Sequence, residues 1–220
     1  MQANTLISSS IKSINPVEDG NTALKMMDQF RINHLAVVKD KYFLAVISDK
    51  EIMNWDSEYD SIEEHLTNLA SPHIKYNQHL FDIIEVLEKN NLSIVPVLDK
   101  ENQYLGIITS RKLMYTIAKS ATIQSAGGVI VLEMNQNDYS LTEIASIVES
   151  NNTKILSSYI ISKPDSTDIE VTIKLNKQDI TAIIKDFERR EYHVSASYKE
   201  EENDTDFLER YESLMRFLNP

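Results

Sequence analysis

One stretch of the chain, AVISDKEIM at 45–53, places a serine hydroxyl three residues before a carboxylate. The hydroxyl belongs to Ser48 and the carboxylate to Glu51. Serine is a favoured N-cap residue of helices, and a glutamate three residues later returns a hydrogen bond to the backbone of the cap. The pair therefore predicts a capping box at the start of a helix.

A second stretch, GIITSRKLM at 106–114, repeats this arrangement but replaces the carboxylate with an ammonium group. Thr109 stands where the first stretch has its serine, and Lys112 stands where it has its glutamate. An ammonium group has donors only, so Lys112 cannot accept a hydrogen bond from the backbone N–H of the cap. Lys112 therefore either has another function or is a solvated lysine.

The remaining residue types that perform chemistry do not form a recognisable catalytic set. The histidines at 65, 73, 79 and 193 lack the i, i+4 spacing or the carboxylate partner of a metal-binding helix. The chain contains no cysteine, which excludes disulfides, thiolate nucleophiles and cysteine-ligated zinc. No serine or aspartate stands in a nucleophile motif. We predict no metal site and a protein that is not an enzyme.

The composition is that of a folded protein that contacts neither nucleic acid nor a membrane. Hydrophobic residues make up 42% and charged residues 25% of the chain, and no run approaches the roughly 18 apolar residues of a membrane helix. A formal net charge of −12 disfavours a nucleic-acid partner, and four glycines are too few for the known phosphate-binding loops. The N-terminal MQANTLISSSIK does not resemble a secretory signal, so we expect a cytoplasmic location.

The two stretches lie in an internal repeat. Met27 aligns with Leu87 at an offset of 60, and Met53 aligns with Met114 at an offset of 61. The one-residue slip falls in a polar loop, where an insertion costs little. Each copy predicts the order strand, helix, strand, turn, strand, helix.

Within each copy, hydrophobic periodicity places the hydroxyl where a strand ends and a helix begins. The runs at 35–38 and 94–98 are rich in β-branched residues, and the segments FLAVIS and YLGIIT are their hairpin partners. The preceding helix of each copy has an apolar stripe at i, i+3, i+4 and i+7. The stripes comprise Ala23, Met26, Met27 and Phe30 in the first copy, and Leu80, Ile83, Ile84 and Leu87 in the second.

This pattern of a strand, an apolar helix, hPV and G-h-h-[ST]-x-x-[DN]-h resembles the CBS domain, and the tandem resembles a CBS pair, or Bateman module. The resemblance covers residues 7 to 120, with Ala36 and Ala45 in place of the usual Pro and Gly of the first copy. It implies an α/β (α+β) fold in which two sheets pack about a pseudo-twofold axis. It also implies two clefts that bind adenine nucleotides such as AMP or ATP, with the [ST] hydroxyl facing phosphate and the acidic residue holding the ribose.

Carried onto this chain, the resemblance implies nine candidate nucleotide-binding residues. These are His34, Leu35, Ala36, Ser48, Glu51, Ile94, Pro96, Thr109 and Lys112. Glu51 keeps the acidic charge on a longer side chain, whereas Lys112 is suited to phosphate and is predicted to point into its cleft. His34 either lies at the mouth of a cleft or is a structural histidine.

After SAGG at 125–128 the pattern changes to βαββαβ, which is typical of a ferredoxin-like domain. Two amphipathic helices, at 140–152 and 178–190, are expected to cover one face of a four-stranded antiparallel sheet. They carry apolar stripes at Leu141, Ile144, Ala145 and Val148, and at Ile180, Ile183, Ile184 and Phe187. Joined to a CBS pair, this domain resembles an ACT domain, and the chain resembles CBS-ACT proteins of the acetoin utilisation protein B-like type.

ACT domains often bind amino acids in the turn after their first strand, which the resemblance places at NQNDY in this chain. The candidate residues of this turn are Asn135, Asn137, Asp138 and Ser140. Asn137 or Asp138 is expected in the left-handed conformation, and Ser140 with Glu143 predicts another capping box. The alternatives are a ligand at this helix N-terminus or a sheet that serves only for dimerisation.

The predicted organisation is a first CBS repeat at 1–60, a second at 61–122, an ACT-like domain at 125–199, and an acidic connector with an amphipathic helix at 200–220. That helix is expected to dock on its own protomer or on another subunit or partner. We predict a homodimeric, allosteric, ligand-sensing regulator. The alternative is a protein that has lost its ligand and keeps the fold as a scaffold for partner proteins.

Overall fold

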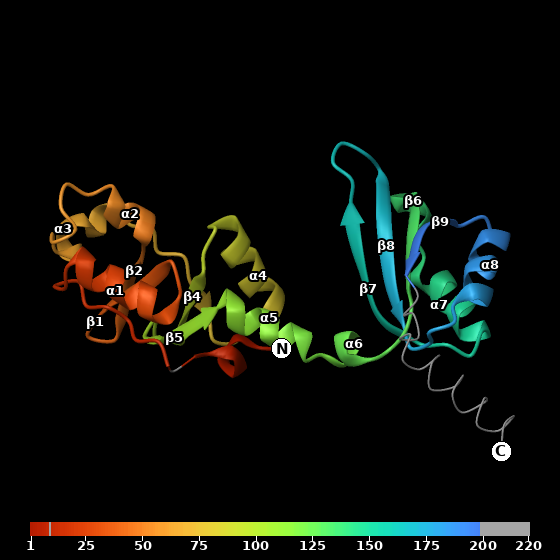
Figure 1. Cartoon of the computed structure of the whole chain (residues 1–220), viewed down its shortest axis with the longest axis horizontal. Coiled ribbons are helices and arrows are strands. Elements are labelled where there is room, and N and C mark those ends of the chain that lie inside the picture. The colour runs from red at the N-terminus through yellow and green to blue at the C-terminus, as the bar shows by residue number, and fades with distance from the viewer. Residues whose placement is uncertain (9, 199–220) are drawn as a thin grey trace, which may run out of the picture. The chain divides into compact units, whose positions relative to one another are not determined.

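The internal repeat appears as two copies of one α/β arrangement in the computed structural model, which describes residues 1–8 and 10–198. The first copy contains α1 (Gly20–Phe30), β1 (His34–Lys39), β2 (Tyr42–Ser48) and α2 (Asp49–Met53). The second contains α4 (Leu80–Lys89), β4 (Ile94–Leu98), β5 (Tyr104–Thr109) and α5 (Ser110–Ala118). Short elements flank them: η1 (Ala3–Leu6), α3 (Ile62–His65), η2 (Leu66–Asn68) and β3 (Ile74–Lys75). Both copies belong to one compact unit, Met1–Ala118 (Figure 1).

Strand pairing repeats from one copy to the other. In each copy the two long strands form an antiparallel hairpin, and a short segment adds in parallel to the first of them. Ile14 bridges to Val37 in the first copy, and Ile74 pairs with Val97 in the second, each partner displaced by 60 positions. The predicted order of elements is therefore confirmed for the second copy, and for the first copy from its long helix onward, where the expected first strand is reduced to the single bridge at Ile14.

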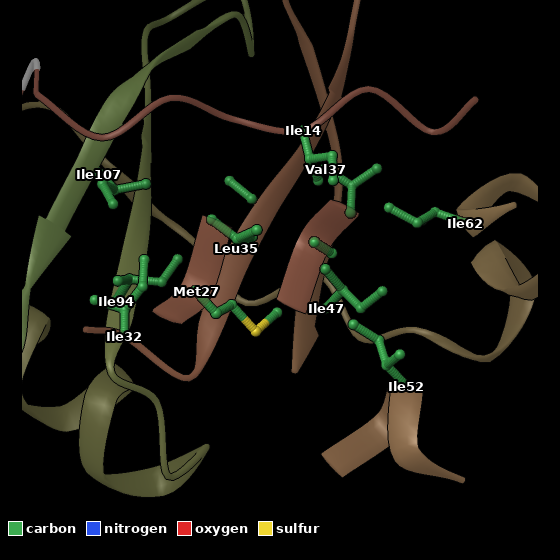
Figure 2. Packing of buried hydrophobic residues seen from close by; sticks show 12 residues of the cluster. Ile14, Met27, Ile32, Leu35, Val37, Ile47, Ile52, Ile62, Ile94 and Ile107 are labelled. Carbon is green, nitrogen blue, oxygen red and sulfur yellow. The ribbon is translucent and has the colours of Figure 1, made fainter. Parts of the chain in front are cut away.

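The two copies share hydrophobic packing. Figure 2 shows Ile94 and Ile107 of the second copy in the same cluster as Leu35 and Met27 of the first. The N-terminal segment packs with the second copy instead, because Ala3 and Leu6 belong to its core cluster. The copies are thus joined through buried apolar side chains.

The second unit begins at Lys119 with α6 (Ala121–Gln124) and continues into a four-stranded sheet. Its elements are β6 (Val129–Asn135), η3 (Gln136–Asp138), α7 (Leu141–Ser150), β7 (Ile155–Ser162), β8 (Asp168–Leu175), α8 (Thr181–Arg189) and β9 (His193–Tyr198). The sheet has the order β7-β8-β6-β9 with every pair antiparallel, and α7 and α8 lie on one side of it (Figure 1). This is the ferredoxin-like fold expected of an ACT-like domain.

The buried faces of the helices differ in detail from the predicted stripes. In α7 the buried residues are Ile144, Ile147 and Val148, so the face is rotated away from Leu141, whose side chain is 48% exposed. The predicted stripe did not include Ile147. Because Ile147 is buried, the apolar face of α7 is centred between Ile144 and Val148 and excludes Leu141. Ile84 of α4 is 38% exposed for the same reason, because the burial of α4 centres on Ile83 and Leu87.

Within residues 1–8 and 10–198, no helix combines the length and apolar character needed to cross a bilayer. The acidic connector and helix predicted at 200–220 lie outside the described residues.

Candidate ligand-binding clefts

Two cavities lie between the copies, one at the start of α2 and one at the start of α5. The α2 cleft has a volume of about 450 Å³ and the α5 cleft about 600 Å³. The α2 cleft is lined by Asn33, His34, Ser48, Asp49, Lys50, Asn90, Asn91, Leu92, Ser93 and Ser110. The α5 cleft is lined by Ser8, Ser10, Ile11, Gln29, Phe30, Arg31, Ile32, Ser93, Thr109, Ser110, Arg111, Lys112 and Tyr115.

The two clefts are related by the repeat. Each is formed by the C-terminal end of one copy's long helix and the N-terminal end of the other copy's last helix. A left-handed residue follows each long helix, Arg31 with φ 54° directly after α1 and Asn91 with φ 49° two residues after α4, and directs the chain back into the next strand. The hydrogen bond from Asp49 N to Asn33 O, at 3.1 Å, recurs from Ser110 N to Ser93 O at 3.0 Å. A pseudo-twofold relation between the copies follows.

At the α2 cleft, the lining hydroxyl of Ser48 is bonded to the Glu51 carboxylate, which lies outside the cleft. Ser48 is 8% exposed, and its Oγ accepts from Glu51 N at 3.1 Å and donates to Glu51 Oε2 at 2.8 Å. The same Oε2 accepts from Ser48 N at 2.7 Å. The predicted capping box is confirmed. Glu51 lines a smaller cavity beside Trp55 and His65 and is absent from the lining of the α2 cleft.

In the α5 cleft, the equivalent hydroxyl has a partner on one side only. Thr109 is also 8% exposed, and its Oγ1 accepts from Lys112 N at 3.0 Å. Among the residues that the structure describes, no acceptor receives the Thr109 hydroxyl hydrogen. Because a lysine replaces the glutamate, this cleft keeps a nearly buried donor beside a cation.

Positive charge gathers around the α5 cleft. Arg31, Arg111 and Lys112 line it, and over residues 1–8 and 10–198 none of the three is in an ion pair. The Arg111 guanidinium lies 5.7 Å from the centre of the Tyr115 ring, within the range of a cation–π interaction. The α2 cleft instead contains Asp49 with Lys50, and Asp49 Oδ2 accepts from Asn33 Nδ2 at 2.7 Å.

His34 joins the two copies. Its Nδ1 accepts from Ser93 N at 3.2 Å and lies 3.0 Å from Ser93 Oγ, which in turn accepts from Asn33 N at 3.0 Å. Burial lowers the pKa of His34, although Asp49 and Glu51 oppose this. The ring is therefore held neutral as a hydrogen-bond acceptor at the edge of the α2 cleft.

The other predicted residues lie behind the clefts. Leu35, Ala36 and Ile94 are at most 1% exposed, and Pro96 is also buried, so these four form core beneath the cavity walls. The structure adds Arg31, Arg111 and Tyr115, which sequence reasoning missed. Aligning the helix ends through the repeat identifies Arg31 as a cleft residue. The spacing i, i+4 on the predicted helix already places Arg111 beside Tyr115, but that both line the cleft requires the folded structure.

In the second unit, the turn after β6 is closed by its own hydrogen bonds. Asn135 Oδ1 accepts from Asn137 N at 3.1 Å, and Asn135 Nδ2 donates to Thr167 Oγ1 at 2.7 Å. Neither Asn137 nor Asp138 has a positive φ, so the expected left-handed residue was wrong. The η3 turn satisfies the backbone without one.

The capping box predicted at α7 forms only in part. Ser140 Oγ accepts from Glu143 N at 3.3 Å, but the Glu143 carboxylate accepts from Tyr192 Oη at 2.9 Å instead of the cap backbone. Burial and this hydrogen bond raise the pKa of Tyr192 to about 12. A hydrogen bond from Tyr192, which follows α8, thus replaces the bond that Glu143 was expected to accept from the cap backbone.

No cluster of metal-ligating side chains occurs among the residues described here.

A family model of the CBS domain matches residues 3–58 and 68–119. The chain is similar to the crystal structure of a CBS domain pair/ACT domain protein from Thermotoga maritima, at 14% identity and a TM-score of 0.47, over 55% of this chain and 99% of that one. It is also similar to CBSX2 in complex with AMP, at 16% identity and a TM-score of 0.44, over 54% and 96% of the two chains. A third similar structure is the CBS domain of a bacterial CNNM/CorC family Mg²⁺ transporter in complex with ATP, at 11% identity and a TM-score of 0.44, over 54% and 87%.

Proposed function

The chain carries two CBS domains in tandem, at residues 3–58 and 68–119, and on this premise we propose that it is a regulatory module that senses an adenine nucleotide such as AMP or ATP. The nucleotide, or a related phosphate-bearing metabolite, binds in the clefts between the copies. Its binding is transmitted to a second copy of the chain or to a partner protein.

The observation that carries this proposal is the pair of cavities related by the repeat. Their volumes of about 450 and 600 Å³ fall within the roughly 300 to 1,000 Å³ of small-molecule sites. Because residues of both copies line each cavity, a bound ligand contacts both and favours one relative arrangement of them. A coupling of about 1 to 3 kcal/mol is typical of such regulation and requires no reaction.

The test is a thermal-shift screen of the full chain against AMP, ADP, ATP, NAD, cyclic dinucleotides and amino acids. A ligand at 100 times its Kd stabilises the folded state by about 2.7 kcal/mol, which is a readily measured rise in Tm. We expect at least one adenine nucleotide to raise Tm. If none of these compounds changes Tm, the proposal fails.

Transmission is proposed to run through a homodimer of the second unit. The strand β7 lies at the edge of its sheet, and its segment ILSSYIIS contains no charged residue. Tyr159, Ile160 and Ile161 are 45% to 56% exposed on this edge. Sheet edges that remain unpaired usually carry charges, prolines or bulges. The register of β7 is irregular between Ile155 and Ser157, but the strand has no charge or proline, and its apolar part beyond this point favours pairing with a second copy.

The second candidate function is a scaffold without a ligand. It is favoured by the capping box that occupies Glu51 and by the closed turn around Asn135, since both remove polar groups from the predicted sites. Empty clefts in a crystal grown with nucleotides, together with a stable co-purifying protein, would support the scaffold. The cytoplasmic location and the acetoin utilisation protein B-like type stay predictions.

A further inference from the structure

Among the differences between the two clefts, the exchange of Glu51 for Lys112 changes what each helix-capping hydroxyl can do. Ser48 donates its hydrogen to the Glu51 carboxylate at 2.8 Å. Thr109 has the same position and the same 8% exposure, but within the described part of the chain its hydroxyl hydrogen has no acceptor. A donor that lines a cavity and has no protein acceptor is available to an acceptor atom of a bound ligand.

The α5 cleft also lacks a carboxylate that could accept hydrogen bonds from the two hydroxyls of a ribose. None of its described lining residues is an aspartate or glutamate, and three of them, Arg31, Arg111 and Lys112, are cations without an ion pair in that same part of the chain. In a chain with a formal net charge of −12, such a concentration of positive charge attracts a polyanion specifically to this place.

The α2 cleft lacks both features. Its hydroxyl is consumed by the capping box, its lining contains the Asp49 carboxylate beside Lys50, and burial lowers the pKa of His34 so that its ring adds no charge. Two cavities related by the repeat therefore differ in the charge that they present to a ligand.

We propose that the α5 cleft is the single nucleotide site of the chain and that it recognises the phosphate chain of a nucleoside triphosphate rather than its ribose. This inference rests on the proposed function and specifies its ligand class. The Thr109 hydroxyl and the Lys112 ammonium donate to phosphate oxygens, and Arg31 and Arg111 complete the charge around the polyphosphate. Charge-assisted hydrogen bonds of this kind are the strong ones.

The experiment is isothermal titration calorimetry of the full chain with ATP, 2′-deoxy-ATP, 3′-deoxy-ATP, AMP and inorganic tripolyphosphate. We expect one ATP per chain, deoxy-ATP affinities within about threefold of ATP, AMP weaker by at least about tenfold, and competition of tripolyphosphate with ATP.

The decisive variant is Lys112→Glu, which copies the capping box of the first stretch and is therefore expected to fold. It gives the Thr109 hydroxyl a protein acceptor and reverses a charge in the cleft, so ATP affinity should fall by more than about tenfold. Lys50→Glu makes the same charge change in the α2 cleft and is the matched control, with an ATP affinity expected within about twofold of the unmodified chain.

The outcomes separate this inference from the function on which it rests. Binding of two ATP per chain, a loss of more than about tenfold on removing a ribose hydroxyl, or equal effects of Lys50→Glu and Lys112→Glu would overturn the inference and leave nucleotide sensing intact. Binding of tripolyphosphate but of no nucleotide would support phosphate recognition and overturn nucleotide sensing. Binding of none of the five compounds would overturn the inference, and a thermal-shift screen without any response would overturn the proposed function as well.

Discussion

At the scale of residues, the hydroxyl at the end of β5 has two tasks that a variant can separate. Thr109 caps α5 through the bond from Lys112 N, so Thr109→Ala should lower the free energy of unfolding by about 1 kcal/mol. It should also weaken binding of ATP, because the donor to phosphate is lost. Thr109→Ser keeps the hydroxyl and should retain both properties. Urea denaturation and calorimetry measure them, and an alanine variant as stable as the parent would show that the cap contributes nothing.

His34 gives the chain a dependence on pH. Burial lowers the pKa of His34 in the folded state, with Asp49 and Glu51 opposing and Lys50 assisting. The unfolded chain therefore binds more protons as the pH falls through the ordinary pKa of histidine, and stability decreases in that window. At pH values above the ordinary pKa of histidine, the ring is neutral in both the folded and the unfolded chain, and His34 does not lower stability. Urea denaturation between about pH 8 and 5 should show this loss.

The matched variants are His34→Asn and His73→Asn. The asparagine side chain at 34 supplies an acceptor for Ser93 N but cannot be protonated, so the loss of stability at low pH should shrink. His73 is exposed, and its replacement should leave the pH dependence unchanged. Equal pH profiles of the parent and His34→Asn would contradict the assignment.

Sequence patterns predicted hydrogen bonds within one helical turn well, but they did not predict hydrogen bonds between residues distant in sequence. The Ser48–Glu51 box formed as predicted because both of its bonds lie within one turn. The box expected at Ser140 lost its carboxylate to Tyr192, a residue distant in sequence. A competing partner of that kind appears only when helix and strand are brought together.

At the scale of elements, β5 is held close to the N-terminal segment by Gly106. Its φ is +144°, and a Cβ there would lie 2.6 Å from Ile7 Cγ2. Gly106→Ala should therefore cost about 2 kcal/mol or more of stability. The aligned residue of the first copy is Ala45, whose φ is not positive, so Ala45→Gly should cost only about 0.5 to 1 kcal/mol. Urea denaturation of both variants compares them, and equal losses would refute the argument.

The N-terminal segment, residues 1–8, shows why helices and strands could be predicted from the sequence while the elements they pack against could not. Hydrophobic period and turn residues located the helices and hairpins of both copies. The pairing of Ser8 with Ile107, and the packing of Ala3 and Leu6 in the second copy, bring residues 1–8 to the opposite half of the repeat. A segment this short has no periodicity from which its partner can be inferred.

At the scale of the whole molecule, each cleft exists only because the copies meet. Thr109 and Arg31 are 78 positions apart in sequence, from different copies, and both line the α5 cleft. The resemblance to a CBS pair predicted that two clefts would form. Of the cations that distinguish them, Arg111 and Lys112 come from the start of α5, whereas Arg31 comes from the end of α1 in the other copy. A difference in ligand between the clefts therefore follows from assembly rather than from either stretch alone.

The final prediction concerns the dimer proposed at β7. Ile161 pairs with Glu170, and Tyr159 with Thr172, so these two side chains lie on the sheet face opposite to the helices, whereas Val171 faces them. Ile161→Lys places a charge in the proposed edge of contact, where an antiparallel pair of β7 strands would bring the two copies of it close together.

Light scattering after size-exclusion chromatography should therefore find a dimer of the unmodified chain and a monomer of Ile161→Lys. Leu141→Lys is the control, because Leu141 is 48% exposed in the same unit but lies on α7, away from the β7 edge. It should remain dimeric. A monomeric parent chain would exclude the dimer. A dimer that survives Ile161→Lys would move the contact to another surface, because like charges on paired strands are destabilising.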